Sequence, residues 1–218
     1  MNTNTSTKKR FRIYKKLLMP ENDTLSTVKQ LVMEKGTNIF NPDGKRYQTR
    51  LQNCSIKRAL IEALGSRTKE LEGRTAGSFY ILFSAKGCEQ QQWHYDFDPK
   101  LLENQAIKPC GVIWAIQNET KLSILSEGGD VTLQKGDCLI FDGDCVHAGS
   151  RYDKRQNTRV HCYLEVPGLQ RTANTTWFWN KPSTVLSDQT NSSAHAQSST
   201  IAEQSSPEAR LKRNEQIV

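Results

Sequence analysis

The sequence predicts a mainly β fold with flanking α-helices, whose β part is expected to form a jelly roll of the double-stranded β-helix type. Three observations favour this fold. From residue 77 onward, apolar and polar residues alternate over short runs, turn-forming residues separate the runs, and helical periodicity is confined to the preceding part. The expected strands span residues 78–84, 91–97, 111–117, 122–125, 131–133, 137–141 and 159–166.

Turn-forming pairs mark the gaps between these runs. They include Lys86-Gly87, Asn118-Glu119 and the segments 127–130 and 135–137. Many short strands joined by hairpin turns are typical of a sandwich or barrel, in which polar side chains can face a tapered interior with apolar walls.

Two amphipathic helices are expected before the strands. The first should run from a cap among residues 22–24 to Gly36, and the second from a cap at Asn53 or Ser55 to a stop at Gly65. Each has a single apolar stripe, so both are expected to buttress the outside of a sheet. The stripes are Leu25, Val28, Leu31 and Val32, and then Ile56, Leu60, Ile61 and Leu64.

The two ends of the chain are expected to lie outside this domain. Residues 1–20 are interpreted as a basic flexible N-terminal arm, residues 21–182 as the domain with its helices, and residues 183–218 as a disordered tail, because that tail is polar and lacks apolar clusters. His195 in the tail is expected to be solvated. The aromatic segment 177–179 is expected to cap the core, with a position at the lip of a substrate pocket as the alternative.

The net charge of +7 is concentrated near the N-terminus. Residues 1–52 hold 11 Lys or Arg against 4 Asp or Glu, whereas the remainder holds 19 of each. In the segment 8–16, basic residues alternate with aromatic ones, a pattern that suits contact with nucleic-acid phosphates or a nuclear or organellar address. A solvated extension without a partner is the alternative.

The composition favours an intracellular protein, either cytoplasmic or nuclear. No apolar run approaches the roughly 20 residues that span a bilayer, and no apolar stretch follows the first basic residues as a secretion signal requires. The six cysteines lack paired spacing, which predicts reduced core thiols and no disulfide framework. No feature of the sequence indicates an oligomeric state.

His94 and Asp96 form a candidate metal-binding pair. Alternate side chains of a strand share one face, so residues two apart can hold one ion together. Alone, this pair is common by chance, and a lone strand histidine is more often structural. Asp98 offers a second carboxylate on the same face, but the spacing favours Asp96. His147, from a distant strand, would complete a two-histidine, one-carboxylate facial triad with three positions free for substrate and dioxygen.

Arg159 lies twelve residues after His147, in a predicted strand where Arg159, His161 and Tyr163 share a face. A planar guanidinium can hold a carboxylate through two parallel hydrogen bonds. Pairing of Arg159 with a neighbouring Asp or Glu is the structural alternative.

Taken together, His94-x-Asp96, His147 and Arg159 resemble the Fe(II)- and 2-oxoglutarate-dependent dioxygenases, over residues 77–166. The segments 147–150 and 159–163 look like the prolyl-hydroxylase and phytanoyl-CoA hydroxylase branch. One departure is that many members have Arg-x-Ser where this chain has Arg159-Val160-His161.

The resemblance implies that His94, Asp96 and His147 bind Fe(II), and that Arg159 pairs with the 5-carboxylate of 2-oxoglutarate, helped by His161 and Tyr163. With O2 as the oxidant, the protein would hydroxylate or demethylate an unidentified substrate and release succinate and CO2. The substrate class, whether protein, nucleic acid or small metabolite, is not indicated.

Two alternatives to a dioxygenase remain open on the sequence, and a zinc site is a third that the residues disfavour. A cupin-like metal-binding protein would have a similar fold and would not use 2-oxoglutarate. A noncatalytic β-scaffold could serve as a binding module that presents the basic arm. Zinc held by Cys138, Cys145 and His147 is disfavoured, because the chain offers neither a Cys-x-x-Cys pair nor two close histidines.

Overall fold

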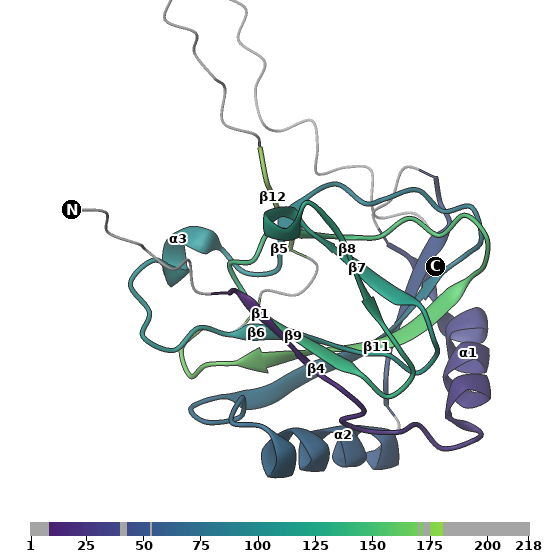
Figure 1. The fold of residues 1–218 in the computed structure, drawn as a ribbon, viewed down its shortest axis with the longest axis horizontal. Coiled ribbons are helices and arrows are strands. Elements are labelled where there is room, and N and C mark those ends of the chain that lie inside the picture. Colours follow the sequence, from purple (N-terminus) through teal and green to yellow (C-terminus); the bar gives the residue numbers. More distant parts are fainter. Residues whose placement is uncertain (1–8, 40–42, 53, 170, 172–174, 181–218) are drawn as a thin grey trace, which may run out of the picture. The chain divides into compact units, whose positions relative to one another are not determined.

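The computed structural model describes residues 9–39, 43–52, 54–169, 171 and 175–180, and its ribbon is drawn in Figure 1. Two antiparallel sheets carry the fold, as the sequence predicts. The first has seven strands, in the spatial order β1 (Phe11–Tyr14), β9 (Cys138–Asp142), β6 (Cys110–Trp114), β11 (Asn157–Glu165), β4 (Thr75–Ser84), β3 (Arg46–Arg50) and β2 (Thr37–Asn38). The second has five, in the order β12 (Trp177–Phe178), β5 (His94–Tyr95), β10 (His147–Gly149), β7 (Thr120–Ile124) and β8 (Gly129–Leu133).

Apolar side chains from both sheets meet in one core. Ile113, Leu139 and Phe141 of the larger sheet pack with side chains such as Leu122 and Ile124 of the smaller one, and all five are buried. Alternation along the strands explains this layer, because every second side chain of β6, β7 and β9 points between the sheets.

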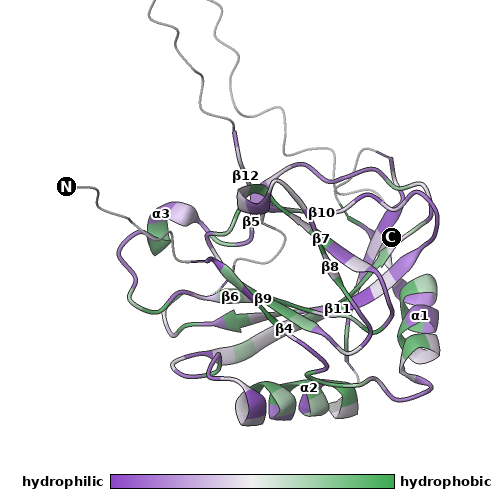
Figure 2. Ribbon diagram, viewed as in Figure 1, coloured by the Kyte–Doolittle hydropathy of each residue, from purple (hydrophilic) through white to green (hydrophobic). Residues whose placement is uncertain are grey.

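Helices α1 (Thr24–Lys35) and α2 (Cys54–Arg67) pack on the outer face of the larger sheet, which confirms their predicted role. Figure 2 shows hydrophobic stretches on both helices. Val28 and Leu60 are fully buried there against strand residues such as Ile81. Helix α1 ends before Gly36, as predicted. Helix α2 continues two residues past the predicted stop at Gly65, because a single glycine weakens a helix without ending it.

The segment interpreted as a flexible arm differs most from expectation. Phe11–Tyr14 form the edge strand β1, and Phe11 pairs with Phe141 at the start of a four-residue register along β9. The phenyl ring of Phe11 is buried in the core between the sheets. The expected tail and His195 lie outside the described residues, so the predicted boundary near residue 182 stays a prediction.

The strand predictions hold in the centre of the larger sheet and fail at its edges. In the smaller sheet no predicted run covers the central strand β10, although His147 was expected on a strand. Strand β5 covers only His94–Tyr95 of the predicted 91–97, and the hairpin of β2 and β3 was not predicted. Short elements α3 (Pro99–Leu102) and a 3-10 turn (Leu125–Glu127) complete the described part. Five cysteines within it are buried and form no disulfide, as expected for core thiols. None of the described helices is both long and apolar enough to cross a bilayer.

Candidate metal centre and its pocket

A pocket of about 400 Å³ opens between the two sheets. All six candidate residues named from the sequence line it: His94, Asp96, His147, Arg159, His161 and Tyr163. Its apolar wall comes from four core side chains, namely Leu82, Ile113, Leu122 and Phe141. The fold therefore gathers residues separated by up to about seventy positions into one small cavity.

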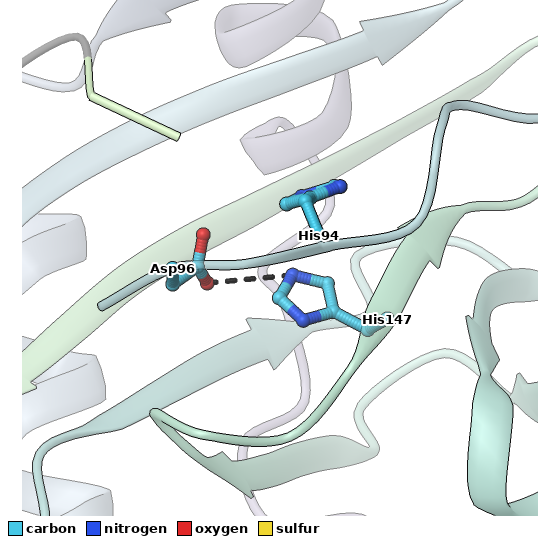
Figure 3. A group of neighbouring side chains, drawn as sticks. All are labelled: His94, Asp96 and His147. Carbon is cyan, nitrogen blue, oxygen red and sulfur yellow. Dashed lines mark ion pairs between the residues drawn. The ribbon is translucent and has the colours of Figure 1, made fainter. Parts of the chain in front are cut away.

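The pairing of β5 with β10 places the two histidines side by side. His147 is the direct antiparallel partner of His94, and Asp96 follows two residues further along the same segment. Potential ligand atoms of the three side chains all lie within 4.8 Å of one another. Figure 3 shows Asp96 and His94 on one segment and His147 on the neighbouring strand, with the contact between Asp96 Oδ2 and His147 Nε2 at 3.5 Å.

The backbone orients both imidazole rings. His94 Nδ1 lies 2.7 Å from the carbonyl oxygen of Gln92, and His147 Nδ1 lies 2.9 Å from that of Cys145. A carbonyl oxygen only accepts, so each Nδ1 carries the proton and donates. This tautomer leaves both Nε2 lone pairs free to bind a metal, which is the usual role of such a partner behind a metal-binding histidine.

The protonation states also suit a metal. Burial, and then the neighbouring His147, lower the pKa of His94 to about 4, so its ring is neutral at neutral pH. Burial alone would raise the pKa of Asp96, but His147, His161 and Arg171 outweigh it and lower this pKa below its usual value. Asp96 Oδ2 is buried and has no hydrogen-bond partner among the described residues. A buried carboxylate oxygen without a donor is the atom that a cation would satisfy.

Two competing ligand sets do not form. The Asp98 carboxylate accepts from the backbone N–H of Lys100 at 3.0 Å and caps α3, which leaves Asp96 as the carboxylate beside the histidines. Burial raises the pKa of Cys145 to about 12 and that of Cys138 well above its usual value, so both stay thiols. Within the described segments, His94, Asp96 and His147 are the one cluster with metal-ligand geometry, so the cysteine-containing zinc site finds no support.

Arg159 lies deep in the pocket and has no carboxylate partner in the described part of the chain. Its side chain is 2% exposed, Nη1 donates to the Ser84 hydroxyl at 3.1 Å, and Nε has no partner there. A buried guanidinium lacking an acidic partner is costly, since taking a charge out of water is offset only by an opposite charge or by hydrogen bonds. No described Asp or Glu forms an ion pair with Arg159, so these residues do not support the structural alternative of an acidic neighbour.

A second buried arginine, Arg46, was missed by the sequence reasoning. Arg46 is fully buried, and its Nη1 donates to the same Ser84 hydroxyl at 2.8 Å. Its Nη2 donates to three carbonyl oxygens, those of Glu89 at 2.7 Å, Gly149 at 3.1 Å and Ser150 at 2.6 Å. Burial and then the charge of Arg159 lower the pKa of Arg46 to about 10. Arg46 thus ties the segment that leads to His94 to the segment that follows His147.

His161 and Tyr163 extend from β11 toward the metal cluster. His161 Nε2 lies 3.7 Å from Asp96 Oδ2, and the Tyr163 hydroxyl donates to Asp96 Oδ1 at 3.5 Å. Burial lowers the pKa of His161 to about 3 and raises that of Tyr163 well above its usual value, so both rings are neutral. Their predicted contact with a cosubstrate stays a prediction, since here they flank the carboxylate.

The mouth of the pocket contains residues that the sequence did not single out. Arg171 Nε donates to the Asp96 carbonyl oxygen at 3.1 Å, and its guanidinium lies 4.7 Å from the Tyr163 ring centre. Phe178 pairs with His94 across β12 and β5, is 39% exposed and lines the pocket. The favoured prediction that segment 177–179 caps the core is therefore wrong for Phe178, which lies at the lip, the alternative position.

Solved structures share this fold. HygX from Streptomyces hygroscopicus, with nickel, 2-oxoglutarate and hygromycin B bound, matches with a TM-score of 0.54 at 9% identity, over 72% of this chain and 83% of that chain. A truncated viral collagen prolyl hydroxylase, vCPH from Paramecium Bursaria Chlorella virus-1, gives 0.52 at 12% identity, over 72% and 91%. The epimerase SnoN, in complex with Fe3+, alpha ketoglutarate and nogalamycin RO, gives 0.52 at 13% identity, over 76% and 86%.

These matches confirm the predicted double-stranded β-helix fold. At 9–13% identity the likeness concerns the fold. No family model matches the sequence, and a search of curated proteins found no match. The chemistry must therefore be argued from the pocket itself.

Proposed function

We propose that the chain is an Fe(II)- and 2-oxoglutarate-dependent dioxygenase that hydroxylates or demethylates a substrate not yet identified. One observation carries the proposal: a cluster of two histidines and one carboxylate shares a pocket of about 400 Å³ with a buried arginine that has no acidic partner among the described residues. A metal explains the first half of this arrangement, and a cosubstrate carboxylate explains the second.

The ligand set fits Fe(II). Two imidazole nitrogens and one carboxylate oxygen are the donors of the facial triad of non-haem iron oxygenases. In a facial set the ligands are mutually cis, so bonds of about 2.1 Å place their atoms about 3 Å apart. The Asp96–His147 separation of 3.5 Å is close to this value, and all three candidate ligand atoms lie within 4.8 Å of one another. Bound Fe(II), with 2-oxoglutarate and O2, supplies the oxidising chemistry and yields succinate and CO2. His94, Asp96 and His147 hold the ion in this proposal.

Arg159 is assigned to the far carboxylate of 2-oxoglutarate. It lies two residues from His161 on β11, which is about 6.6 Å along a strand, on the same face. The cosubstrate would therefore lie along this face, from the metal cluster to the guanidinium. Its charge would compensate the two adjacent cations Arg159 and Arg46 in a site where water screens them poorly.

The remaining pocket residues position these groups. The Tyr163 hydroxyl donates to Asp96 Oδ1, which leaves Oδ2 directed at His147 and the ion. Phe141 packs against the rings of His147 and His161, and this aromatic wall excludes water from the metal side of the pocket. The substrate would approach past Phe178 and Arg171, which line the same pocket.

Structural neighbours support the assignment by analogy. HygX was solved with 2-oxoglutarate and a metal in place, and SnoN with Fe3+ and alpha ketoglutarate. Because one fold supports many reactions, they favour the cosubstrate and leave the substrate open.

The test measures succinate formed from 2-oxoglutarate by purified protein with Fe(II), ascorbate and O2, without added substrate. We expect slow uncoupled turnover that Asp96→Asn removes. Iron bound in a one-to-one ratio without any succinate, even with candidate substrates present, would contradict the proposal and favour the cupin-like alternative. Absence of both iron binding and succinate would favour the noncatalytic scaffold.

A further inference from the structure

A second cavity, far larger than the first, lies on the outside of the fold. It has a volume of about 910 Å³, and we call it the outer basic cleft. Six basic side chains line it: Arg10, Arg12, Arg67, Lys69, Arg74 and Lys108. They come from the N-terminal strand, the end of α2, the turn before β4 and the loop before β6, so the folded chain gathers cations that are scattered in the sequence.

Three carboxylates also line the cleft, Glu70, Asp142 and Asp144. Six positive charges against three negative ones leave an excess of three. Glu70 and Asp144 lie on the floor, with side chains that are 8% and 11% exposed, whereas Arg10 and Arg12 face solvent, at 52% and 48%. Arg74 and Lys108 lie deeper, at 13% and 28%. An anion that approaches from solvent therefore meets the guanidinium groups first.

The buried acids also hold the cations in fixed positions. Glu70 accepts from Arg12 Nη1 at 2.9 Å and lies 3.6 Å from Arg74 Nη1. Asp144 accepts from Lys108 Nζ at 2.6 Å and lies 3.4 Å from Arg10 Nη1. Each arginine keeps unused N–H groups, and a guanidinium fixed in this way loses less entropy when it binds a further anion.

Two of the six cations have no acid beneath them. Arg67, at the exposed end of α2, donates to the neutral carbonyl oxygens of Leu17 and Lys16. Lys69 is exposed and forms no ion pair with any described residue. These two side chains carry two of the three excess positive charges of the cleft.

We propose that the outer basic cleft binds the sugar–phosphate backbone of a nucleic-acid strand. Four of the six cations are arginines, whose forked N–H groups match the paired oxygens of a phosphodiester. The cations are spread over four segments along an open cleft, which suits a polymer with one charge about every 3.4 Å per strand. The site is distinct from the pocket at the candidate metal centre.

The experiment titrates the full chain against fluorescein-labelled 20-nucleotide single-stranded RNA and DNA and follows fluorescence anisotropy at 50, 100 and 200 mM KCl. Lys69→Glu and Arg67→Glu should each weaken binding on the order of fivefold at 100 mM, and reduce the slope of log affinity against log salt by about one. The control is Lys154→Glu, an equal charge change at an exposed position outside the cleft, which should leave affinity within about twofold. Thermal melts establish that the variants are folded.

Several results would overturn the proposal. One is that the cleft variants behave like Lys154→Glu, and another is that neither oligonucleotide binds at 50 mM salt. A third is that a polyglutamate peptide of equal charge binds as tightly as RNA, because the cleft would then take acidic peptides. Point variants are required here, because deleting residues 1–18 would also remove strand β1.

Discussion

The candidate pocket and the outer basic cleft both contain positively charged side chains, but they differ in how far these charges are buried and neutralised. Arg159 lines the pocket and Arg46 lies next to it. Both are buried, both donate to the Ser84 hydroxyl, and neither forms an ion pair with a described carboxylate. In the outer basic cleft, Arg10 and Arg12 are half exposed, and each pairs with a buried carboxylate, Asp144 or Glu70. Burial without compensation prepares a site for one small anion of matching charge, whereas exposed and partly compensated cations suit a long, weakly held polyanion.

The largest effect is expected from removing the negative charge of Asp96 at the metal side of the pocket. Asp96→Asn should abolish Fe(II) binding, with affinity at least about 100-fold lower, because it replaces the one anionic ligand. Anaerobic titration with Fe(II) measures this. Asp98→Asn is the matched control, since asparagine also caps helices well and α3 is retained. Loss of iron in Asp98→Asn with retention in Asp96→Asn would reassign the ligand.

The next largest effect is expected from replacing Arg159, the buried cation of the pocket. Arg159→Met should weaken 2-oxoglutarate binding about 100-fold while Fe(II) affinity stays within a few-fold, because truncating one partner of a buried ion pair costs about 2–5 kcal/mol. Calorimetry with each ligand separates the two affinities. Without ligand, the variant should melt no lower than the native chain, because it removes a buried charge that repels Arg46. A lower melting temperature with unchanged 2-oxoglutarate affinity would make Arg159 purely structural.

Arg46 is a positioning residue whose replacement should have a mixed effect. Arg46→Met leaves the carbonyl oxygens of Glu89, Gly149 and Ser150 without their donor, so unfolding free energy should fall by about 2–4 kcal/mol. Because both histidine-bearing segments lose a common anchor, Fe(II) affinity should also fall about tenfold. Urea unfolding and iron titration measure these. Arg50→Met, at the exposed end of the same strand, should change neither.

The sequence predicted which residues the pocket brings together better than it predicted the strands around them. His94, Asp96 and His147 were identifiable because strand alternation puts residues two apart on one face, and a histidine and an arginine at suitable distances completed a familiar pattern. Arg46 could not be found in this way. It lies in the polar strand Arg46–Arg50, and sequence reasoning assigns arginine to the surface unless a partner is visible.

The edges of the sheets were harder to predict for a related reason. Strand β1, at one edge of the larger sheet, reads Phe-Arg-Ile-Tyr in a run of basic residues, and β3, next to the edge strand β2 at the other end, reads Arg-Tyr-Gln-Thr-Arg. Strands at or beside an edge keep charged side chains because part of their surface faces solvent, which makes them resemble flexible polar segments in sequence. Central strands such as β6 and β11 are buried along almost their whole length, and their apolar content made them visible.

Salt concentration distinguishes the two cationic regions without any mutation. If about three phosphates occupy the cleft, affinity for single-stranded RNA should fall about 20-fold between 50 and 200 mM KCl. Buried pairs are screened much less, so 2-oxoglutarate affinity should fall less than about threefold over the same range. Anisotropy and calorimetry at matched salt test this. Equal salt dependence would remove the contrast between the regions.

The smallest effect is expected at the end of β1, outside both cavities, where hydrogen-bond donors and a lysine stabilise the buried carboxylate of Asp137. The buried Asp137 carboxylate accepts from Lys15 Nζ at 2.9 Å and from the backbone N–H groups of Lys16 and Gln134, both at 3.0 Å. Burial alone would raise the pKa of Asp137, but these donors outweigh it and lower the pKa. Because the folded-state pKa is the lower one, the stabilisation is complete above the unfolded-state pKa, near 4, and is lost as pH falls through the folded-state value.

Asp137→Asn should therefore reduce the unfolding free energy by about 1–2 kcal/mol at pH 7, and the difference from the native chain should shrink as pH falls below about 4. Urea unfolding at pH 7, 5 and 3 measures it. Asp153→Asn, at a side chain that is 57% exposed, is the control and should follow the native curve. A difference in unfolding free energy that stays constant down to pH 3 would mean that Asp137 stabilises β1 by its shape and hydrogen bonds and not by its charge. The idea that the negative charge of Asp137 holds this strand in place would then be disproved.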